Sequence, residues 1–138
     1  MDIFFSMNPV QAAALHVGLL VVVMLGLKLY VGMQRGRLQI PSGETTPEFS
    51  RVTRVQLNAV EDVPALMAGI LGLALLGMPV WYIHAVGAVL FVSRILHAIG
   101  LASTSGFSMG RVVGAIGTMI VYFAVAGALL VHAFGPIG

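Results

Sequence analysis

Cysteine is absent from this sequence of 138 residues, and charged side chains are scarce. The lack of cysteine excludes disulfides, metal sites built on thiolates and a cysteine nucleophile. Charged residues make up only 9% of the chain, with a formal net charge of +2, too few for a surface that binds nucleic acid. The four histidines show neither HxxxH nor HxxE spacing, and no GxGxxG motif occurs. Neither a metal site nor a dinucleotide site is therefore predicted.

Apolar residues are correspondingly abundant. They make up 59% of the chain, and the mean hydropathy is +1.01. A soluble single domain of this size has no interior for so much apolar surface, so the sequence predicts an integral membrane protein. The residues before the first apolar run carry no basic charge, and no small-residue cleavage signal follows that run. We therefore interpret this run as a retained membrane span and not as a signal peptide.

Cap and turn signals divide the chain into four predicted spans. An Asn-Pro pair at 8–9 and a Thr-Pro pair at 46–47 are each typical of a helix start. The Gly-Met-Pro sequence at 77–79 is typical of a tight turn. The prediction is an all-α, four-helix up-down bundle that forms one transmembrane domain over residues 1–138. Its helices are expected at about 9–33, 47–77, 79–102 and 107–134.

The basic residues predict how the spans are oriented. All seven lie near the span ends that meet the first and third connections. Because cytoplasmic connections are enriched in lysine and arginine, we expect these two connections on the cytoplasmic side and both termini on the opposite side. The seven residues are Lys28, Arg35, Arg37, Arg51, Arg54, Arg94 and Arg111.

The most polar stretch of the sequence opens the second span and forms a stripe along one helix face. Its members are Arg51, Arg54, Asn58 and Glu61. Their steps of three, four and three residues keep the side chains within an arc of roughly 80°. At 1.5 Å of rise per residue, counted from the far ends of the helices, Glu61 lies at the same depth in the membrane as Arg94 on the third span. The same count places Arg54 level with Arg111 on the fourth, so two charged layers are predicted across the bundle.

This charge has two interpretations. In the plainer one, Glu61 and Asp62 neutralise arginines inside the bundle, and the outermost arginines reach lipid headgroups. The alternative is a binding site, because four arginines against two carboxylates leave an excess of about two positive charges. The planar guanidinium suits carboxylate or phosphate groups, so the excess favours a small anionic ligand at the cytoplasmic end.

Other candidate ligands are isolated in apolar runs. His16, His84 and His132 are predicted to pack or to lie at an interface, and not to bind a ligand. Tyr122 lies eleven residues after Arg111 on nearly the same helix face and about 16 Å deeper, which suits either packing or the path of a lipophilic substrate. Recurring glycines predict close helix packing, at Gly69, Gly72, Gly110, Gly114 and Gly117.

The polar motif resembles that of the MAPEG family, the membrane-associated proteins in eicosanoid and glutathione metabolism. The motif reads Arg51-x-x-Arg54-x-Gln56-x-Asn58-x-x-Glu61, then Arg94-x-x-His97, then Arg111. The resemblance extends from about Pro9 to Phe134 and implies a homotrimer that binds glutathione between protomers on the cytoplasmic side. The implied binding residues are Arg51, Arg54, Gln56, Asn58, Glu61, Arg94 and His97, and the implied catalytic residue is Arg111.

The implied chemistry is conjugation by an activated thiol. A guanidinium beside the sulfur favours the thiolate, which is the nucleophilic form. Several family members carry a Tyr where this chain has Leu101, and Asp62 follows Glu61 where an aromatic or small residue is common. The resemblance therefore implies a bacterial-type, general glutathione transferase or peroxidase of the inner membrane, and not an eicosanoid synthase. A lipophilic electrophile is expected to enter from the bilayer between the first and fourth spans.

Two other functions are weighed against the transferase. A non-catalytic lipid-binding or scaffold protein of the same fold is consistent with the missing Tyr hydroxyl. A small transporter is less favoured, because the first span carries no acidic residue and the charges gather at one end instead of the bilayer midplane.

Overall fold

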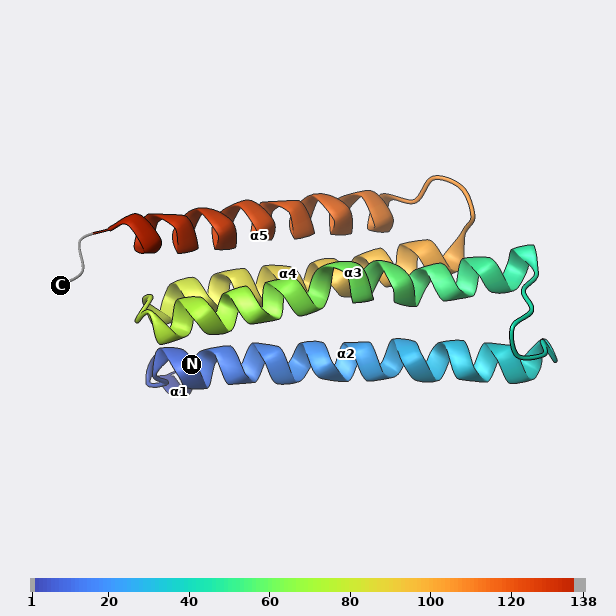
Figure 1. Cartoon of the computed structure of the whole chain (residues 1–138), viewed down its shortest axis with the longest axis horizontal. Helices are drawn as coiled ribbons and strands as arrows, with labels where there is room; N and C mark the ends of the chain where they lie inside the picture. Colours follow the sequence, from blue (N-terminus) through green and yellow to red (C-terminus); the bar gives the residue numbers. More distant parts are fainter. Residues whose placement is uncertain (1, 136–138) are drawn as a thin grey trace.

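The structure, a computed structural model, describes residues 2–135, and this part of the chain is helical with no strand. The prediction of an all-α fold with four long spans is confirmed, and a short helix that the sequence does not predict precedes them. The ends of the predicted domain, residue 1 and residues 136–138, lie outside the described residues. The helices are α1 (Asp2–Phe5), α2 (Pro9–Arg37), α3 (Pro47–Leu75), α4 (Val80–Ser103) and α5 (Met109–Phe134) (Figure 1).

Side-chain caps fix the starts of the first two long helices. The Asn8 side chain accepts a hydrogen bond from the Gln11 amide at 2.9 Å, and the Asn8 amide donates to the Gln11 side chain at 2.9 Å. The Thr46 hydroxyl caps α3 by accepting from the Phe49 amide at 3.2 Å. These bonds satisfy amides that the first helical turn leaves free, so α2 and α3 begin where the sequence predicts.

The helix ends differ from the prediction by a few residues. Helix α2 continues to Arg37, past the predicted end at residue 33, because no glycine C-cap or proline stops it earlier. Helix α3 ends at Leu75, two residues short, since Gly77 turns the chain with a positive φ of 77°. Helix α4 runs from Val80 to Ser103, one residue later at each end than predicted, and α5 begins at Met109, two residues later than predicted.

The long helices are arranged in three layers. Helices α3 and α4 form the middle, α2 packs against one side of them, and α5 packs against the other, mainly on α4 (Figure 1). Among the described residues, α2 and α5 are not packed against each other. The middle layer therefore separates the first and fourth spans of one chain, and the predicted entry path between these helices in neighbouring protomers stays a prediction.

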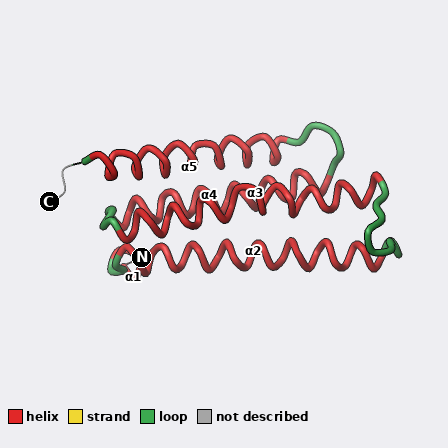
Figure 2. Tube along the Cα trace, viewed as in Figure 1, coloured by secondary structure: helices red, strands yellow, loops and turns green. Residues whose placement is uncertain are grey.

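The two ends of the molecule differ in chemistry. The connections 38–46 and 104–108 lie at one end, and the 76–79 turn lies at the other with the starts of α1 and α2 and the end of α5 (Figure 2). All seven basic residues lie in the halves of their helices nearer the two connections, as predicted, although Arg94 lies well inside α4. That this end faces the cytoplasm stays a prediction.

The outer surfaces of the helices are apolar. Phe123 and Val131 on α5 are 76% and 70% exposed, and Val22 on α2 is 65% exposed. All four long helices are long and apolar enough to cross a membrane. Such surfaces suit an apolar membrane environment, while the core between the layers includes Leu66, Ile70, Leu73, Ile83 and Leu90.

Glycines let α4 and α5 approach closely, as predicted for Gly110 and Gly114. A Cβ atom at Gly114 would overlap the carbonyl oxygen of Ser93 and the backbone of His97. A Cβ at Gly110 would lie 2.9 Å from the carbonyl oxygen of Leu96. The absence of side chains here brings the two backbones together, the arrangement that small residues produce between membrane helices.

Gly114→Ala is expected to lower stability by about 1 to 3 kcal/mol, because the added methyl group forces α4 and α5 apart. The measurement is thermal unfolding in detergent, followed by circular dichroism. Gly127→Ala on the same helix is the matched control, since a Cβ there meets nothing within 4 Å. Equal melting temperatures for the two variants would contradict the close packing at Gly114.

Candidate functional site

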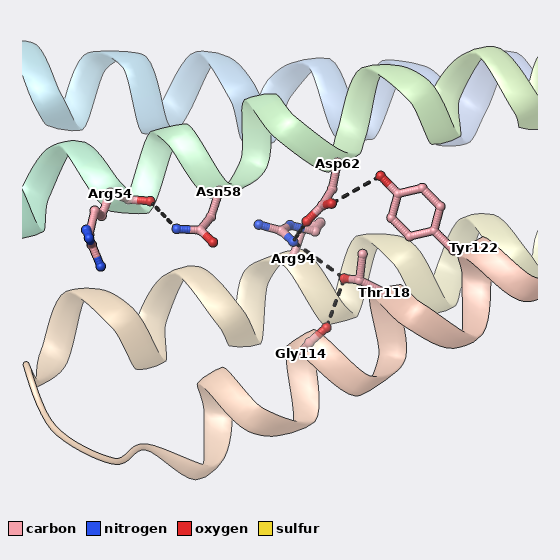
Figure 3. A network of polar contacts seen from close by, with 7 residues as sticks. All are labelled: Arg54, Asn58, Asp62, Arg94, Gly114, Thr118 and Tyr122. Carbon is pink, nitrogen blue, oxygen red and sulfur yellow. Dashed lines mark hydrogen bonds and ion pairs between the residues drawn. The ribbon is translucent and has the colours of Figure 1, made fainter.

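The first two residues of the α3 polar stripe, Arg51 and Arg54, line a cleft together with Arg111 at the start of α5. Arg54 and Glu61 are exposed, and Arg51 and Asn58 are half-buried. The Asn58 side chain donates to the carbonyl oxygen of Arg54 at 2.8 Å (Figure 3). This bond holds the amide group along the helix and leaves its oxygen free to accept.

A cleft of about 500 Å³ opens at the end of the molecule that carries the two connections. It brings together the first turns of α3, the end of α4, the 104–108 connection and the start of α5. Three arginines contribute guanidiniums to its wall, against one carboxylate, so the cleft has an excess of positive charge. Its lining residues are Pro47, Glu48, Ser50, Arg51, Arg54, Leu101, Ser105 and Arg111.

Three of the eight predicted site residues therefore meet at this cleft, namely Arg51, Arg54 and Arg111. The other five do not line it in the single chain. They are Gln56, Asn58, Glu61, Arg94 and His97.

Arg94 is buried, and its guanidinium is bound by side chains of the same chain. It is 2% exposed, and its Nη1 atom donates to the Asp62 carboxylate at 3.0 Å and to the Thr118 hydroxyl at 3.5 Å (Figure 3). The equal height predicted for Glu61 and Arg94 does not make them partners, because the carboxylate that reaches Arg94 belongs to Asp62. Adjacent helix positions differ by about 100° in direction, so Asp62 turns inward while Glu61 is exposed.

Tyr122 belongs to the same network. Its hydroxyl donates to the second oxygen of Asp62 at 3.1 Å, and the Thr118 hydroxyl donates to the carbonyl oxygen of Gly114 at 2.9 Å (Figure 3). The network joins α3, α4 and α5 at membrane depth and satisfies both carboxylate oxygens. Of the two roles predicted for Tyr122, this contact supports the structural one.

His97 lies one helical turn beyond Arg94 and is also buried, at 7% exposure. Its Nδ1 atom and the Nε atom of Arg94 are buried without a hydrogen-bond partner among the described residues. Buried polar atoms are rarely left unpaired, so each has capacity for one bond to a water molecule or a ligand. Gln56 is half-buried on the opposite side of α3 from Arg54.

The ion pairs are unevenly distributed. Among the side chains that the structure describes, Arg94 with Asp62 is the only pair of opposite charges within 4.0 Å. Arg51, Arg54 and Arg111 thus face the cleft without a carboxylate bound to them in the same chain. The plainer interpretation, in which acidic residues neutralise the inner arginines, therefore fails for Arg54 within one chain. That Arg51 and Arg111 reach lipid headgroups stays a prediction.

The histidines near the other end pack as predicted, and two of them contact each other. His16 Nε2 and His84 Nδ1 are 3.0 Å apart, and His84 Nε2 lies 2.9 Å from the carbonyl oxygen of Phe4. The carbonyl must accept, so His84 Nε2 carries the proton and His16 Nε2 donates to His84 Nδ1. The contact ties α1 to α2 and α4, which is a packing role. His132 is exposed, and its Nδ1 atom bonds to the carbonyl oxygen of Ala128.

Sequence reasoning missed three polar cleft residues, namely Glu48, Ser50 and Ser105. Glu48 reads as the first-turn acid of a helix, and Ser105 reads as part of an ordinary turn. Ser105 and Arg111 line the same cleft because α5 packs back against the end of α4. No local sequence pattern predicts this packing. The described residues contain no cluster of three His, Asp or Glu side chains that could hold a metal ion.

Comparison with known proteins gives one match. A family model described as the MAPEG family matches residues 13–131, which is most of the chain. A search of curated proteins finds no match to the chain.

Proposed function

We propose, since the chain belongs to the MAPEG family, that this multi-pass integral membrane protein is a glutathione transferase whose thiol substrate binds at the arginine cleft. The observation that carries the proposal is the meeting of Arg51, Arg54 and Arg111 at one cleft without an ion-pair partner. Glutathione has two carboxylates, and guanidiniums bind carboxylates through paired hydrogen bonds. A cleft of about 500 Å³ is within the usual size of a small-molecule site.

Arg111 is the residue proposed to act on the sulfur. It lies on α5, across the cleft from Arg51 and Arg54 on α3. If the two α3 arginines hold the carboxylates at the two ends of glutathione, the side chain of its central cysteine can point across the cleft toward α5. A fixed positive charge there stabilises the thiolate, which then attacks a lipophilic electrophile or reduces a hydroperoxide.

The five predicted residues outside the cleft lining fit the assembly that the family resemblance implies. In a homotrimer the site lies between protomers, so a second copy adds walls that a single chain lacks. The unpaired atoms of Arg94 and His97 would then receive partners from the ligand, and Asn58 and Glu61 would hold the glutathione amine. Gln56 would contribute from the neighbouring wall. The bacterial inner membrane, with the cleft toward the cytoplasm, is the proposed location.

A second function is favoured by one observation. Leu101 lines the cleft where a hydroxyl group would otherwise contact the ligand. An apolar wall beside three arginines also suits a phospholipid, with its phosphate on the guanidiniums and its chain on Leu101. On this alternative the protein is a non-catalytic lipid-binding or scaffold protein of the same family.

The test is calorimetric titration of the detergent-purified protein with glutathione, together with the rate of glutathione conjugation to chlorodinitrobenzene. The transferase predicts saturable binding and turnover above the uncatalysed rate. Binding without turnover would direct the search to a hydroperoxide substrate. Absence of glutathione binding, with retention of anionic phospholipid through purification, would reject the transferase in favour of the lipid-binding protein.

A further inference from the structure

Arg35, in the last turn of α2, contacts other parts of the same chain. Its side chain is half-buried, and its Cζ atom lies over the Phe49 ring, 4.5 Å from the ring centre. Its Nη1 atom donates to the carbonyl oxygen of Pro41 at 3.0 Å. The guanidinium therefore joins the end of α2 to the 38–46 connection and to the first turn of α3.

These contacts use two different surfaces of the guanidinium group. Its flat face is attracted to the electron-rich face of the aromatic ring, and the N–H groups at its edge donate hydrogen bonds. A lysine ammonium is a point charge without a flat face, so it does not reproduce both contacts. No carboxylate among the described residues lies within 4.0 Å of Arg35. The ring and the loop carbonyl are therefore the groups that hold this side chain.

The 38–46 connection has a backbone conformation that needs such support. Gln39 has a positive φ of 52°, which is unfavourable for a residue with a Cβ atom. The next residue, Ile40, is buried and forms a small apolar cluster with Phe49 and Val52, separate from the main core. Because Arg35 donates to the carbonyl that follows Ile40, it holds the connection in the path that builds this cluster.

The apolar cluster lies behind the wall of the arginine cleft. Phe49 is 1% exposed, while its sequence neighbours Glu48 and Ser50 both line the cleft. Arg51 follows Phe49 by two positions, about 200° around the helix, so the two side chains leave α3 on opposite sides. One side of this helical turn is thus anchored and the other faces the cleft. The position of Phe49 then determines where the Arg51 guanidinium is presented.

We propose that Arg35 is a positioning residue for the arginine cleft. Through Phe49 it holds the first turn of α3, and it thereby sets the affinity for glutathione without touching glutathione. Arg35 is not among the residues that line the cleft. Arg111 belongs to α5, and no residue of α5 is part of the apolar cluster, so the chemistry at the sulfur is independent of Arg35. The proposal rests on the function proposed for the cleft, because glutathione affinity is its main readout.

The alternative is that Arg35 acts by its charge alone. A positive group near the cleft attracts an anionic ligand over several ångströms, whatever the group contacts. Arg37 provides the comparison, because it lies two residues further along the same helix, is exposed and is outside the apolar cluster. Removing either arginine changes the net charge equally, and only one of the two changes breaks the contact with Phe49.

Arg35→Ala is compared with Arg37→Ala by calorimetric titration with glutathione and by the rate of conjugation to chlorodinitrobenzene. We expect Arg35→Ala to raise the Kd and the KM for glutathione about five- to tenfold, with kcat within about twofold of the wild type. Arg37→Ala should keep the Kd within about twofold. A general loss of folded protein would instead lower the apparent kcat and the binding stoichiometry and leave the Kd unchanged.

Arg35→Lys and Phe49→Leu test the contact itself. Arg35→Lys keeps the charge and loses the flat face, so we expect its Kd to stay at least about threefold above that of the wild type. Phe49→Leu removes the ring and keeps an apolar side chain. Combining Phe49→Leu with Arg35→Ala should weaken binding by clearly less than the product of the two single effects, because both changes break the same contact.

The outcomes separate this proposal from the transferase function. Equal affinities for Arg35→Ala and Arg37→Ala overturn the positioning role, as does full recovery of affinity in Arg35→Lys or a double variant in which the two effects multiply. If the wild type does not bind glutathione, the transferase function fails, and hydrogen–deuterium exchange over residues 47–54 decides the role of Arg35. Faster exchange in Arg35→Ala than in Arg37→Ala supports it, and equal exchange overturns it.

Discussion

Arg111→Ala is expected to lower glutathione conjugation to chlorodinitrobenzene by about 100- to 1000-fold while glutathione still binds. The loss is large because the guanidinium acts on charge that develops at the sulfur, and removing one such group costs that much in other active sites. Binding is expected to change by less than about fivefold, since the two α3 arginines proposed to hold the carboxylates remain at the cleft. The rate of conjugation measures the loss of activity, and calorimetric titration measures the change in glutathione affinity.

Two further arginine variants serve as comparisons for Arg111→Ala. Arg54→Ala is expected to weaken glutathione binding about tenfold with little change in kcat, because Arg54 faces the ligand from α3 and not from the thiol side. Arg37→Ala removes an exposed charge at the end of α2, outside the cleft, and serves as the control with unchanged kinetics. An Arg111→Ala protein as active as the Arg37→Ala protein would remove Arg111 from the proposed chemistry.

Asp62→Asn is expected to lower the free energy of unfolding by about 3 kcal/mol or more, the usual cost of breaking a buried ion pair by removing one partner. The large effect follows from the burial of Arg94, which is 2% exposed and bonds to Asp62 at 3.0 Å. Tyr122→Phe removes one neutral hydrogen bond to the same carboxylate and should cost only about 1 kcal/mol. Thermal unfolding in detergent ranks the variants.

The double variant Asp62→Asn with Arg94→Met distinguishes a lost ion pair from a general disturbance of packing. Replacing both partners removes the unpaired buried charge, so most of the stability should return. Glu44→Gln makes a similar change of charge in the exposed 38–46 connection and should leave the melting temperature unaltered. If Asp62→Asn melts with the wild type, the Arg94 charge is compensated by something other than Asp62.

Much of the fold is readable from short sequence signals. The Asn-Pro pair at 8–9 and the Thr-Pro pair at 46–47 start α2 and α3 because their caps act within one turn, at a range that the sequence displays directly. The order of the layers is not readable in this way. In a membrane, lipid and protein neighbours both prefer apolar surface, so hydropathy does not reveal that α2 and α5 lie on opposite sides of α3 and α4.

For the candidate site, too, the sequence predicts some features, and others depend on how the helices pack. Spacing along α3 predicts a common face for Arg51 and Arg54, and both line the cleft with Arg111. The choice between Glu61 and Asp62 as partner of Arg94 depends on how α3 is rotated against α4, which a count of helix rise does not include. The His16 and His84 contact joins residues far apart in the sequence and has no local signal.

The layered arrangement has a consequence for how the protein is made. During synthesis the N-terminal spans leave the ribosome first, so α2, α3 and α4 can assemble before α5 has been translated. The cleft has no Arg111 until α5 docks onto α4 through Gly110 and Gly114. Docking of α5 is then the step that completes the three-arginine cleft within one chain, and a chain that ends after α4 would lack the guanidinium proposed to act on the thiol.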